Sequence, residues 1–243
     1  MLPRTSLLVA IFCLALVGRA ADEAAPLRIH LIGTGEYKPV ESFTEYKKHL
    51  EEHYRVAVTT SFGKDGKSLP NLEQLRNADV MVIFIRRTNL PEEQISIIRE
   101  HWEKGKPVVA LRTASHGFQE ADNITFGKVI GGDYKGPGSY TAPFKAVAAE
   151  GQQDHPILKG VGAINSKGPY GFGKLADEAV VLQIVESDKK VKAPASWVHT
   201  YKGGRTFYTF MGGPEDFQNE EFRRLLANAI FWTAQRDLDK FKR

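Results

Sequence analysis

A run of apolar residues that ends in a cluster of polar ones is the stretch of the sequence best suited to chemistry. Pro107–Leu111 carries no polar side chain, and four polar residues follow it: Arg112, Thr113, Ser115 and His116. The apolar run predicts a strand that is buried on both faces of a mostly parallel sheet. The carboxyl ends of such strands form the ligand crevice, so we expect a functional site here. The alternative is a solvated turn in which a hydroxyl caps the next helix.

Two further segments are expected to bring polar side chains to the same place. Val80–Ile85 is another apolar strand, and it ends in Arg86–Arg87, so these guanidinium groups should lie at the same edge of the sheet. Gly127–Gly138 holds five glycines and one proline, which predicts a long irregular loop or lid that carries Tyr134. A surface excursion without function is the alternative for this loop.

Other segments of the sequence predict the strands and helices that position these residues. Leu27–Ile32 reads as a first strand, and the Gly-x-Gly that follows lacks the third glycine of a dinucleotide fingerprint, so no nucleotide cofactor is expected. Ser42 and Glu45 predict a capping box for the next helix. Pro91 begins another helix, which should end at Gly105. Strands and helices that alternate in this way predict right-handed crossovers and a parallel sheet.

The C-terminal part of the chain predicts a hairpin followed by a helix. Ala195–Tyr201 and Arg205–Phe210 flank Lys-Gly-Gly and form the two strands of the hairpin. The last helix should pack through Phe222, Leu225, Leu226, Ala229, Ile230 and Trp232. Its charged end is expected to fray after Asp237.

His49 and His53 match the H-x-x-E-H pattern of zinc enzymes. A catalytic zinc helix must be buried and continue past its second histidine, whereas here an extended segment begins at Tyr54. The sequence therefore favours a solvated helix end and no metal site, with His53 suited to the dipole of the helix.

The N-terminus has the form of a secretory signal. Arg4 precedes the apolar run Leu7–Val17, which is too short to span a bilayer, and small residues follow it. We expect residues 1–20 to be removed, leaving residues 21–243 as a single domain that is secreted or periplasmic and has no membrane anchor. The only cysteine, Cys13, leaves with the signal, which excludes disulfides, a cysteine nucleophile and thiolate metal sites.

The charge of the mature chain is close to balanced. Loss of Arg4 and Arg19 lowers the count of Lys and Arg from 33 to 31, against 29 Asp and Glu. Basic residues are interleaved with acidic ones, so no stripe for nucleic acid is expected.

Taken together, several segments resemble the trehalose-utilisation (ThuA-like) domain family, within the class I glutamine amidotransferase-like superfamily. The resemblance rests on PVVALRTASHGF, the glycine-rich segment, the His-Pro-Ile turn, PASWVHTYKGGRTFYTFMGGPEDF and RRLLANAIFW, and it covers nearly all of the mature chain. It implies a flavodoxin-like α/β fold, with helices on both faces of a mostly parallel sheet and a C-terminal β-hairpin plus helix. It also implies a function tied to carbohydrate metabolism.

The resemblance excludes glutaminase activity. Arg112 stands where a glutamine amidotransferase has its cysteine nucleophile, and Gly213 stands where it has a histidine. Arginine stays protonated and glycine cannot relay a proton. Members of the ThuA-like family commonly carry histidines in the glycine-rich loop and before Pro214, and this chain has none there.

The residues that remain define the expected site. Glu36 or His116 would move protons, while Arg112 and Arg86 would hold an oxyanion or carboxylate. The expected catalytic residues are Glu36, Arg112 and His116, and the expected substrate-binding residues are Arg86, Thr113, Tyr134, Trp197 and Asp216. Trp197 and Tyr134 would stack on a sugar face, and no cofactor or metal is expected.

Three of these assignments have a structural alternative. His116 could be satisfied by backbone at a helix start, and Trp197 could pack in the core. Arg112 could pair with Glu36 or Asp133 and hold the loops together.

Three functions stay open. The first is an enzyme that acts on a sugar or sugar derivative, and the second is a non-catalytic module that binds a carbohydrate or a partner. The third, a serine hydrolase using Ser115, is disfavoured because the strand ends at Leu111 rather than just before the serine. The substrate, the reaction and the oligomeric state are not specified by the sequence.

Overall fold

The computed structural model describes residues 25–137, 142–186 and 193–243. The predicted secretory signal, its Cys13 and Gly138 at the end of the glycine-rich segment lie outside these residues.

A large mixed sheet organises the described residues. It contains nine strands in the order β2-β1-β3-β4-β11-β10-β9-β6-β7. The parallel part comprises β2 (Val56–Phe62), β1 (Leu27–Gly33), β3 (Val80–Phe84), β4 (Val108–Leu111) and β11 (Gly204–Thr209). The antiparallel part comprises β10 (Pro194–Tyr201), β9 (Val180–Glu186), β6 (Pro143–Ala148) and β7 (Ile164–Lys167). The order of the five parallel strands is that of a flavodoxin-like fold, as the resemblance implied.

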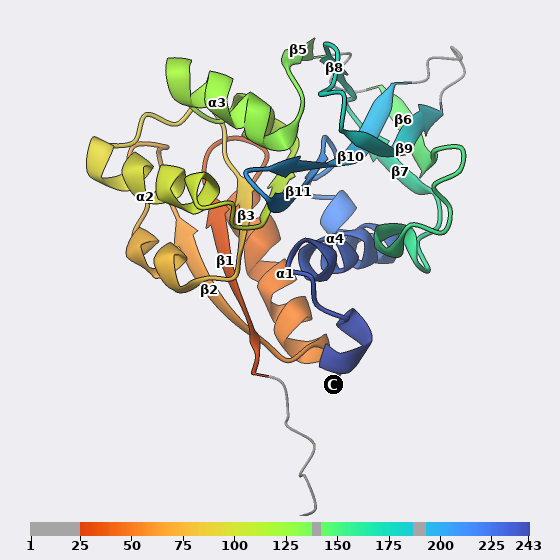
Figure 1. The fold of residues 1–243 in the computed structure, drawn as a ribbon, viewed down its shortest axis with the longest axis horizontal. Helices are drawn as coiled ribbons and strands as arrows, with labels where there is room; N and C mark the ends of the chain where they lie inside the picture. The colour runs from red at the N-terminus through yellow and green to blue at the C-terminus, as the bar shows by residue number, and fades with distance from the viewer. Residues whose placement is uncertain (1–24, 138–141, 187–192) are drawn as a thin grey trace, which may run out of the picture.

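Helices cover both faces of the sheet. One side carries α1 (Pro39–His53) and α4 (Glu220–Thr233), and the other carries α2 (Glu92–Glu103) and α3 (Glu120–Ile130) (Figure 1). Within the described ranges, no helix has both the length and the apolar composition that a membrane span requires. A separate pair of strands, β5 (Tyr134–Pro137) and β8 (Tyr170–Phe172), lies above the end of α3 in Figure 1.

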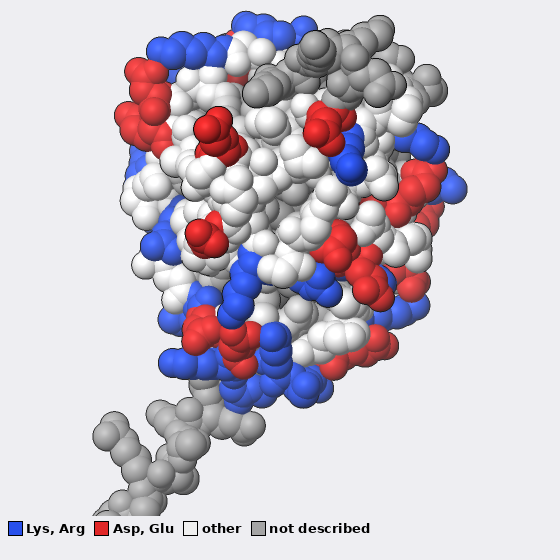
Figure 2. Space-filling model, turned by 90° about the vertical axis from the view of Figure 1, so that its right-hand side faces the viewer, with Lys and Arg blue, Asp and Glu red and all other residues white. Residues whose placement is uncertain are grey.

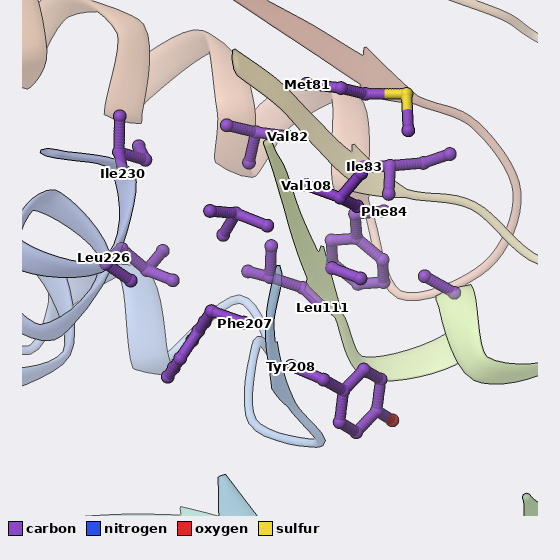
Figure 3. Close-up of a cluster of buried hydrophobic side chains, with 14 of the residues drawn as sticks. Met81, Val82, Ile83, Phe84, Val108, Leu111, Phe207, Tyr208, Leu226 and Ile230 are labelled. Atoms are coloured by element: carbon purple, nitrogen blue, oxygen red, sulfur yellow. The ribbon is translucent and has the colours of Figure 1, made fainter. Parts of the chain in front are cut away.

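The core lies at the centre of the sheet. Every residue of β3 and β4 is buried, which confirms the prediction from their uninterrupted apolar sequences. Figure 3 shows side chains of these strands packed with Phe207 of β11 and with Leu226 and Ile230 of α4. The loops after β3 and β4 therefore start from fixed positions.

Two predicted element boundaries are wrong. Helix α1 begins at Pro39, so Ser42 lies in its first turn, buried, and is not a capping residue. The segment Gly127–Gly138 is not one irregular loop, because its first residues form the last turn of α3 and Tyr134–Pro137 form β5. Gly131, with φ of 68°, ends α3 in a left-handed conformation that favours glycine.

The chain does not fray after Asp237, contrary to the prediction. Leu238–Phe241 forms a 3₁₀ helix, and the buried ring of Phe241 lies 5.3 Å from that of Phe231. The carbonyl of Phe241 also accepts a hydrogen bond from the backbone of Arg55 at 2.7 Å. One buried aromatic side chain thus holds a segment whose charge suggested a loose end.

Candidate functional site

Polar and aromatic side chains gather where the loops after β1, β3 and β4 meet. These are the carboxyl ends of neighbouring parallel strands, and the strand order reverses between β1 and β3. Such a reversal is where ligands bind in open α/β sheets. We call the group at this edge the carboxyl-edge site; it consists of Tyr37, Arg86, Arg112, His116, Tyr134 and Tyr170.

Glu36 and Arg86 form an ion pair at the outer side of this site. A guanidinium nitrogen of Arg86 lies 2.5 Å from a carboxylate oxygen of Glu36. The Glu36 side chain is 62% exposed and the Arg86 side chain 23%. Exposed ion pairs of this kind contribute little to stability. The Glu36 carboxylate is nevertheless engaged by the Arg86 guanidinium in this structure.

Arg112 is the most unusual residue of the site, because it is charged and only 4% exposed. Its Nη1 donates to the backbone carbonyls of Lys167 at 3.4 Å and Phe210 at 3.3 Å. Its guanidinium carbon lies 4.4 Å from the centre of the Tyr37 ring and 5.4 Å from that of Tyr170. Aromatic faces attract a cation, so the two rings hold the side chain from different elements.

The Arg112 charge lacks an ion-pair partner within the described part of the chain, and its Nε–H is buried without an acceptor. The two carboxylates that the sequence offered are engaged elsewhere, Glu36 with Arg86 and Asp133 with Lys135. The alternative that Arg112 forms an ion pair with Glu36 or Asp133 is therefore wrong. Arg112 does link loops, but through backbone carbonyls, and part of its donor capacity stays unused.

The backbone at Arg112 is also strained. Its φ of 48° is left-handed, although the residue is not glycine, and it lies between β4 and the 3₁₀ helix Arg112–His116. A strained strand-to-helix turn is how other α/β enzymes present a nucleophile. The buried hydroxyl of Tyr208 donates to the Arg112 carbonyl at 2.6 Å and so supports the turn. This chain keeps the turn but places a guanidinium there.

His116 lies beside the arginines as a neutral ring. It is 9% exposed, and its ring stacks on that of Tyr134 at 4.0 Å with an interplanar angle of 20°. Burial, reinforced by the positive charges of Arg86, Arg87 and Arg112, lowers the pKa of His116 to about 4. At neutral pH the imidazole is therefore uncharged and can accept or donate a hydrogen bond.

Ser115 does not offer an exposed nucleophile. Its hydroxyl lies 3.3 Å from Nδ1 of His116, but the residue is only 2% exposed. The same hydroxyl donates to the Arg112 carbonyl at 3.3 Å and lies 3.2 Å from the hydroxyl of Tyr208. The geometry gives no support to a serine hydrolase.

Asp216 is buried next to the site and organises a loop. Its Oδ2 accepts hydrogen bonds from the backbone of Gly212 at 2.7 Å and Gly213 at 2.8 Å, and from the Ser166 hydroxyl at 3.0 Å. Burial raises the pKa of Asp216, while these hydrogen bonds and the charge of Arg112 oppose that shift. Its oxygen is thus occupied by the protein, and its observed role is to fix the loop after β11.

Two predicted substrate-binding residues lie in the core instead. Trp197 has no exposed surface, and its indole N–H donates to the Ile130 carbonyl at 2.6 Å. Its ring is covered by Tyr208 at 4.6 Å, so the expected stacking on a sugar is wrong and the packing alternative holds. Thr113 is also fully buried, and its hydroxyl donates to the Ile85 carbonyl at 2.7 Å. Neither side chain can touch a ligand in this structure.

The structure adds two tyrosines that the sequence analysis missed. Tyr37 follows Glu36 directly, so the loop after the first strand could have indicated it. Tyr170 lies on β8, far from the other site residues in sequence, and its ring is 5.4 Å from that of Tyr134 and 5.7 Å from that of His116. No local pattern marks it.

The H-x-x-E-H segment lies away from this site. Helix α1 ends at His53 and the chain turns extended at Tyr54, as the sequence predicted. Within the described ranges, no group of three or more His, Cys, Asp or Glu side chains is arranged to hold a metal ion.

Comparison with known proteins gives one family match and several structural likenesses. The ThuA family model, described as trehalose utilisation, matches residues 32–233. A ThuA-like protein from Bacteroides uniformis superposes with a TM-score of 0.66 at 17% identity, covering 86% of this chain and 92% of that one. For a ThuA-like protein from Parabacteroides merdae the TM-score is 0.65 at 16% identity, with coverages of 86% and 90%.

A beta-galactosidase from Bacillus circulans sp. alkalophilus gives a TM-score of 0.62 at 12% identity, covering 90% of this chain but 32% of that one. No curated protein matches the sequence. At such low identities the solved structures support the fold alone, and function must be argued from the site.

Proposed function

The chain belongs to the trehalose-utilisation (ThuA) family, and we propose that its carboxyl-edge site binds a sugar derivative that carries a carboxylate or a similar oxyanion. The observation that carries this proposal is the guanidinium of Arg112, buried and without an ion-pair partner in the described part of the chain. A buried charge is costly when it is unpaired, and a ligand carboxylate would relieve that cost.

The aromatic residues support a sugar as the rest of the ligand. Tyr37, Tyr134 and Tyr170 come from three different elements and surround Arg112 and His116. Tyrosine combines an apolar ring with a hydroxyl, which suits the mixed surface of a carbohydrate. The neutral imidazole of His116 adds a hydrogen-bonding group that can serve a sugar hydroxyl.

The geometry favours binding over turnover. Arg112 fills the position of a nucleophile and cannot act as one, and the carboxylate of Glu36 is paired with Arg86. His116 is the group best placed to move a proton, which keeps proton transfer as the second candidate activity. Recovery of the bound sugar unchanged after long incubation would favour binding, whereas a product whose formation is lost in His116→Gln would establish catalysis.

The predicted secretory signal indicates where the protein would bind its ligand. Removal of residues 1–20 would place the domain outside the cytoplasm, where it would meet sugars before uptake. Sequencing of the exported protein is expected to give an N-terminus near Ala21.

A matched pair of ligands tests the proposal. Glucuronate and glucose differ by a carboxylate in place of a hydroxymethyl group, so their effects on the melting temperature isolate the anionic contact. We expect glucuronate to raise the melting temperature and glucose to raise it less, because binding to the native state alone adds stability. Acetate serves as the control for the anion without the sugar. Equal shifts with glucuronate and glucose, or equal shifts with glucuronate and acetate, would contradict the proposal.

A further inference from the structure

A second pocket lies between the later turns of α1 and the beginning of α4, two helices that lie side by side on one face of the sheet (Figure 1). Its volume is about 460 Å³, and none of its residues belongs to the carboxyl-edge site. The lining residues used below are Lys48, His49, Glu52, His53, Glu220 and Arg223.

The two histidines of the H-x-x-E-H segment form one wall of this pocket. The rings of His49 and His53 lie 4.3 Å apart, and the ring of Tyr46 stacks on the other side of His49 at 5.9 Å. Nδ1 of His53 donates to the His49 carbonyl at 2.9 Å. The stacking holds the His49 ring beside the pocket, and the described residues supply no third ligand for a metal.

Arg223 on α4 supplies a cation without an ion-pair partner in the described part of the chain. Its Nε–H is buried without an acceptor, and no ion-pair partner is found for it among the described residues. The neighbouring cations differ, since Lys48 pairs with Glu45 at 2.9 Å and Arg224 pairs with Glu221 at 3.1 Å. Arg223 also lines the pocket, so an anionic ligand oxygen there would give its guanidinium charge a partner.

Arg223 and His49 face the same space. Both line the pocket, and the pKa of His49 is lowered mainly by burial, then by His53 and by the positive charge of Arg223. The two remaining carboxylates of the lining, Glu52 and Glu220, are exposed to solvent. These two negative charges partly offset the positive charge of Arg223, so the pocket favours a ligand with a single anionic group over a highly charged one.

We propose that this α1–α4 pocket binds a small phosphate-bearing compound, with Arg223 as the anchor and His49 as a second hydrogen-bonding group. A guanidinium presents a fork of donors that matches two phosphate oxygens, and an imidazole can reach a third. The volume leaves room for an organic group beside the phosphate. The pocket is a separate site, so its occupation does not depend on the sugar proposed for the carboxyl-edge site.

The experiment is a titration of the mature protein with inorganic phosphate, followed through the histidine side-chain signals by NMR at constant ionic strength. We expect the His49 signal to shift and saturate with phosphate, while chloride at the same ionic strength leaves it unchanged. Arg223→Met should weaken phosphate binding about tenfold or more, as for loss of a hydrogen bond to a charged group. Arg224 also lines the pocket, but its guanidinium is exposed and already paired with Glu221, so Arg224→Met should change the affinity by less than about twofold.

Two results would overturn the proposal. One is a His49 signal that chloride shifts as much as phosphate does, and the other is an equal loss in Arg223→Met and Arg224→Met, which would show a general effect of surface charge. His49→Gln provides a second variant should Arg223→Met fail to fold. It keeps a polar side chain on α1, and we expect its phosphate affinity, followed by calorimetry, to fall several-fold, whereas an unchanged affinity would remove His49 from the site.

Discussion

Acidification from pH 8 to pH 5 should destabilise this protein strongly, because it buries neutral histidines. Burial lowers the pKa of His30, His101 and His116 to about 4 in each case. His30 is fully buried between Thr59 and Ser61, and Nδ1 of His101 has no hydrogen-bond partner in the described residues. Protonation would therefore place a charge where water is excluded.

The direction and the size of this loss of stability follow from the difference in proton binding between the folded and unfolded states. A lowered pKa means that the folded protein binds fewer protons than the unfolded chain, so the stability is fully present above pH 6.5 and is lost as the pH falls towards 4. With an unfolded value of 6.5 and a folded value of about 4, each histidine removes at most about 2 kcal/mol at pH 5 relative to pH 8. Three such residues remove at most about 6 kcal/mol, which is comparable with the whole stability of many domains.

Urea unfolding at pH 8, 6.5 and 5, followed by tryptophan fluorescence, measures this loss. The control is His30→Gln, which keeps polar atoms towards Thr59 and Ser61 but cannot titrate. The variant should be less stable at pH 8, and on acidification its loss of stability should be smaller than that of the wild type by up to about 2 kcal/mol, the contribution of His30. A free energy of unfolding that is constant from pH 8 to pH 5, or a slope that His30→Gln leaves unchanged, would refute the reasoning.

Four further variants test individual contacts. Gly105→Ala should cost about 3 kcal/mol or more in urea unfolding, because its new Cβ would lie 2.2 Å from a carbonyl oxygen of the β10–β11 turn. Gly203→Ala, also at positive φ but in open space, should cost about 1–2 kcal/mol, and equal losses would contradict the clash. Tyr208→Phe removes the shorter of the two hydroxyl hydrogen bonds to the buried Arg112 carbonyl, and only that of Ser115 at 3.3 Å remains. It should cost about 1–1.5 kcal/mol and weaken glucuronate binding by calorimetry, so an affinity that stays the same would show that the turn does not need the Tyr208 hydroxyl. Glu36→Gln breaks an exposed ion pair and should change stability by less than about 1 kcal/mol, and a larger loss would mean that the pair is more than a surface contact.

The sequence predicted the framework well because the framework depends on local patterns. The uninterrupted apolar runs of β3 and β4 have few structural uses besides a buried parallel strand. The Lys-Gly-Gly turn likewise predicts the β10–β11 hairpin. Arg86, Arg112 and His116 were found at the site because each follows the end of such a strand.

The failures concern contacts between distant segments. Trp197 was expected to meet a ligand, but its indole donates to Ile130 at the end of α3. Gly132, just after that helix, leaves room for the ring: a Cβ there would lie 2.6 Å from the indole. Tyr170 reaches the site because β8 pairs with β5, and no spacing along the chain signals this. Asp216 was predicted as a site residue, but three donors of the protein hydrogen-bond to one of its oxygens. That arrangement depends on the folded loop and has no signal in the sequence.

The sequence gives the number of charged residues but not where they lie in the fold or which of them are paired. Acidic and basic side chains lie near one another around the rim and in the lower part of the face shown in Figure 2, and most of its centre is uncharged. The expectation that the chain binds no nucleic acid stays a prediction. What the composition could not indicate is that Arg112 and the Nε–H of Arg223 are buried, and that neither guanidinium has an ion-pair partner in the described residues.

In the function proposed here, the guanidinium of Arg112, which has no ion-pair partner in the part of the chain that the structure describes, binds the anionic group of a sugar derivative. Calorimetric titration of glucuronate into the wild-type protein and into Arg112→Met tests it most directly, with melting temperatures recorded for both. The account predicts that Arg112→Met loses about tenfold or more in affinity, as for a lost hydrogen bond to a charged group, while the protein stays folded at the temperature of the titration. A variant that binds glucuronate as tightly as the wild type, with a lowered melting temperature, would show that Arg112 only holds the loops together and would contradict the claim.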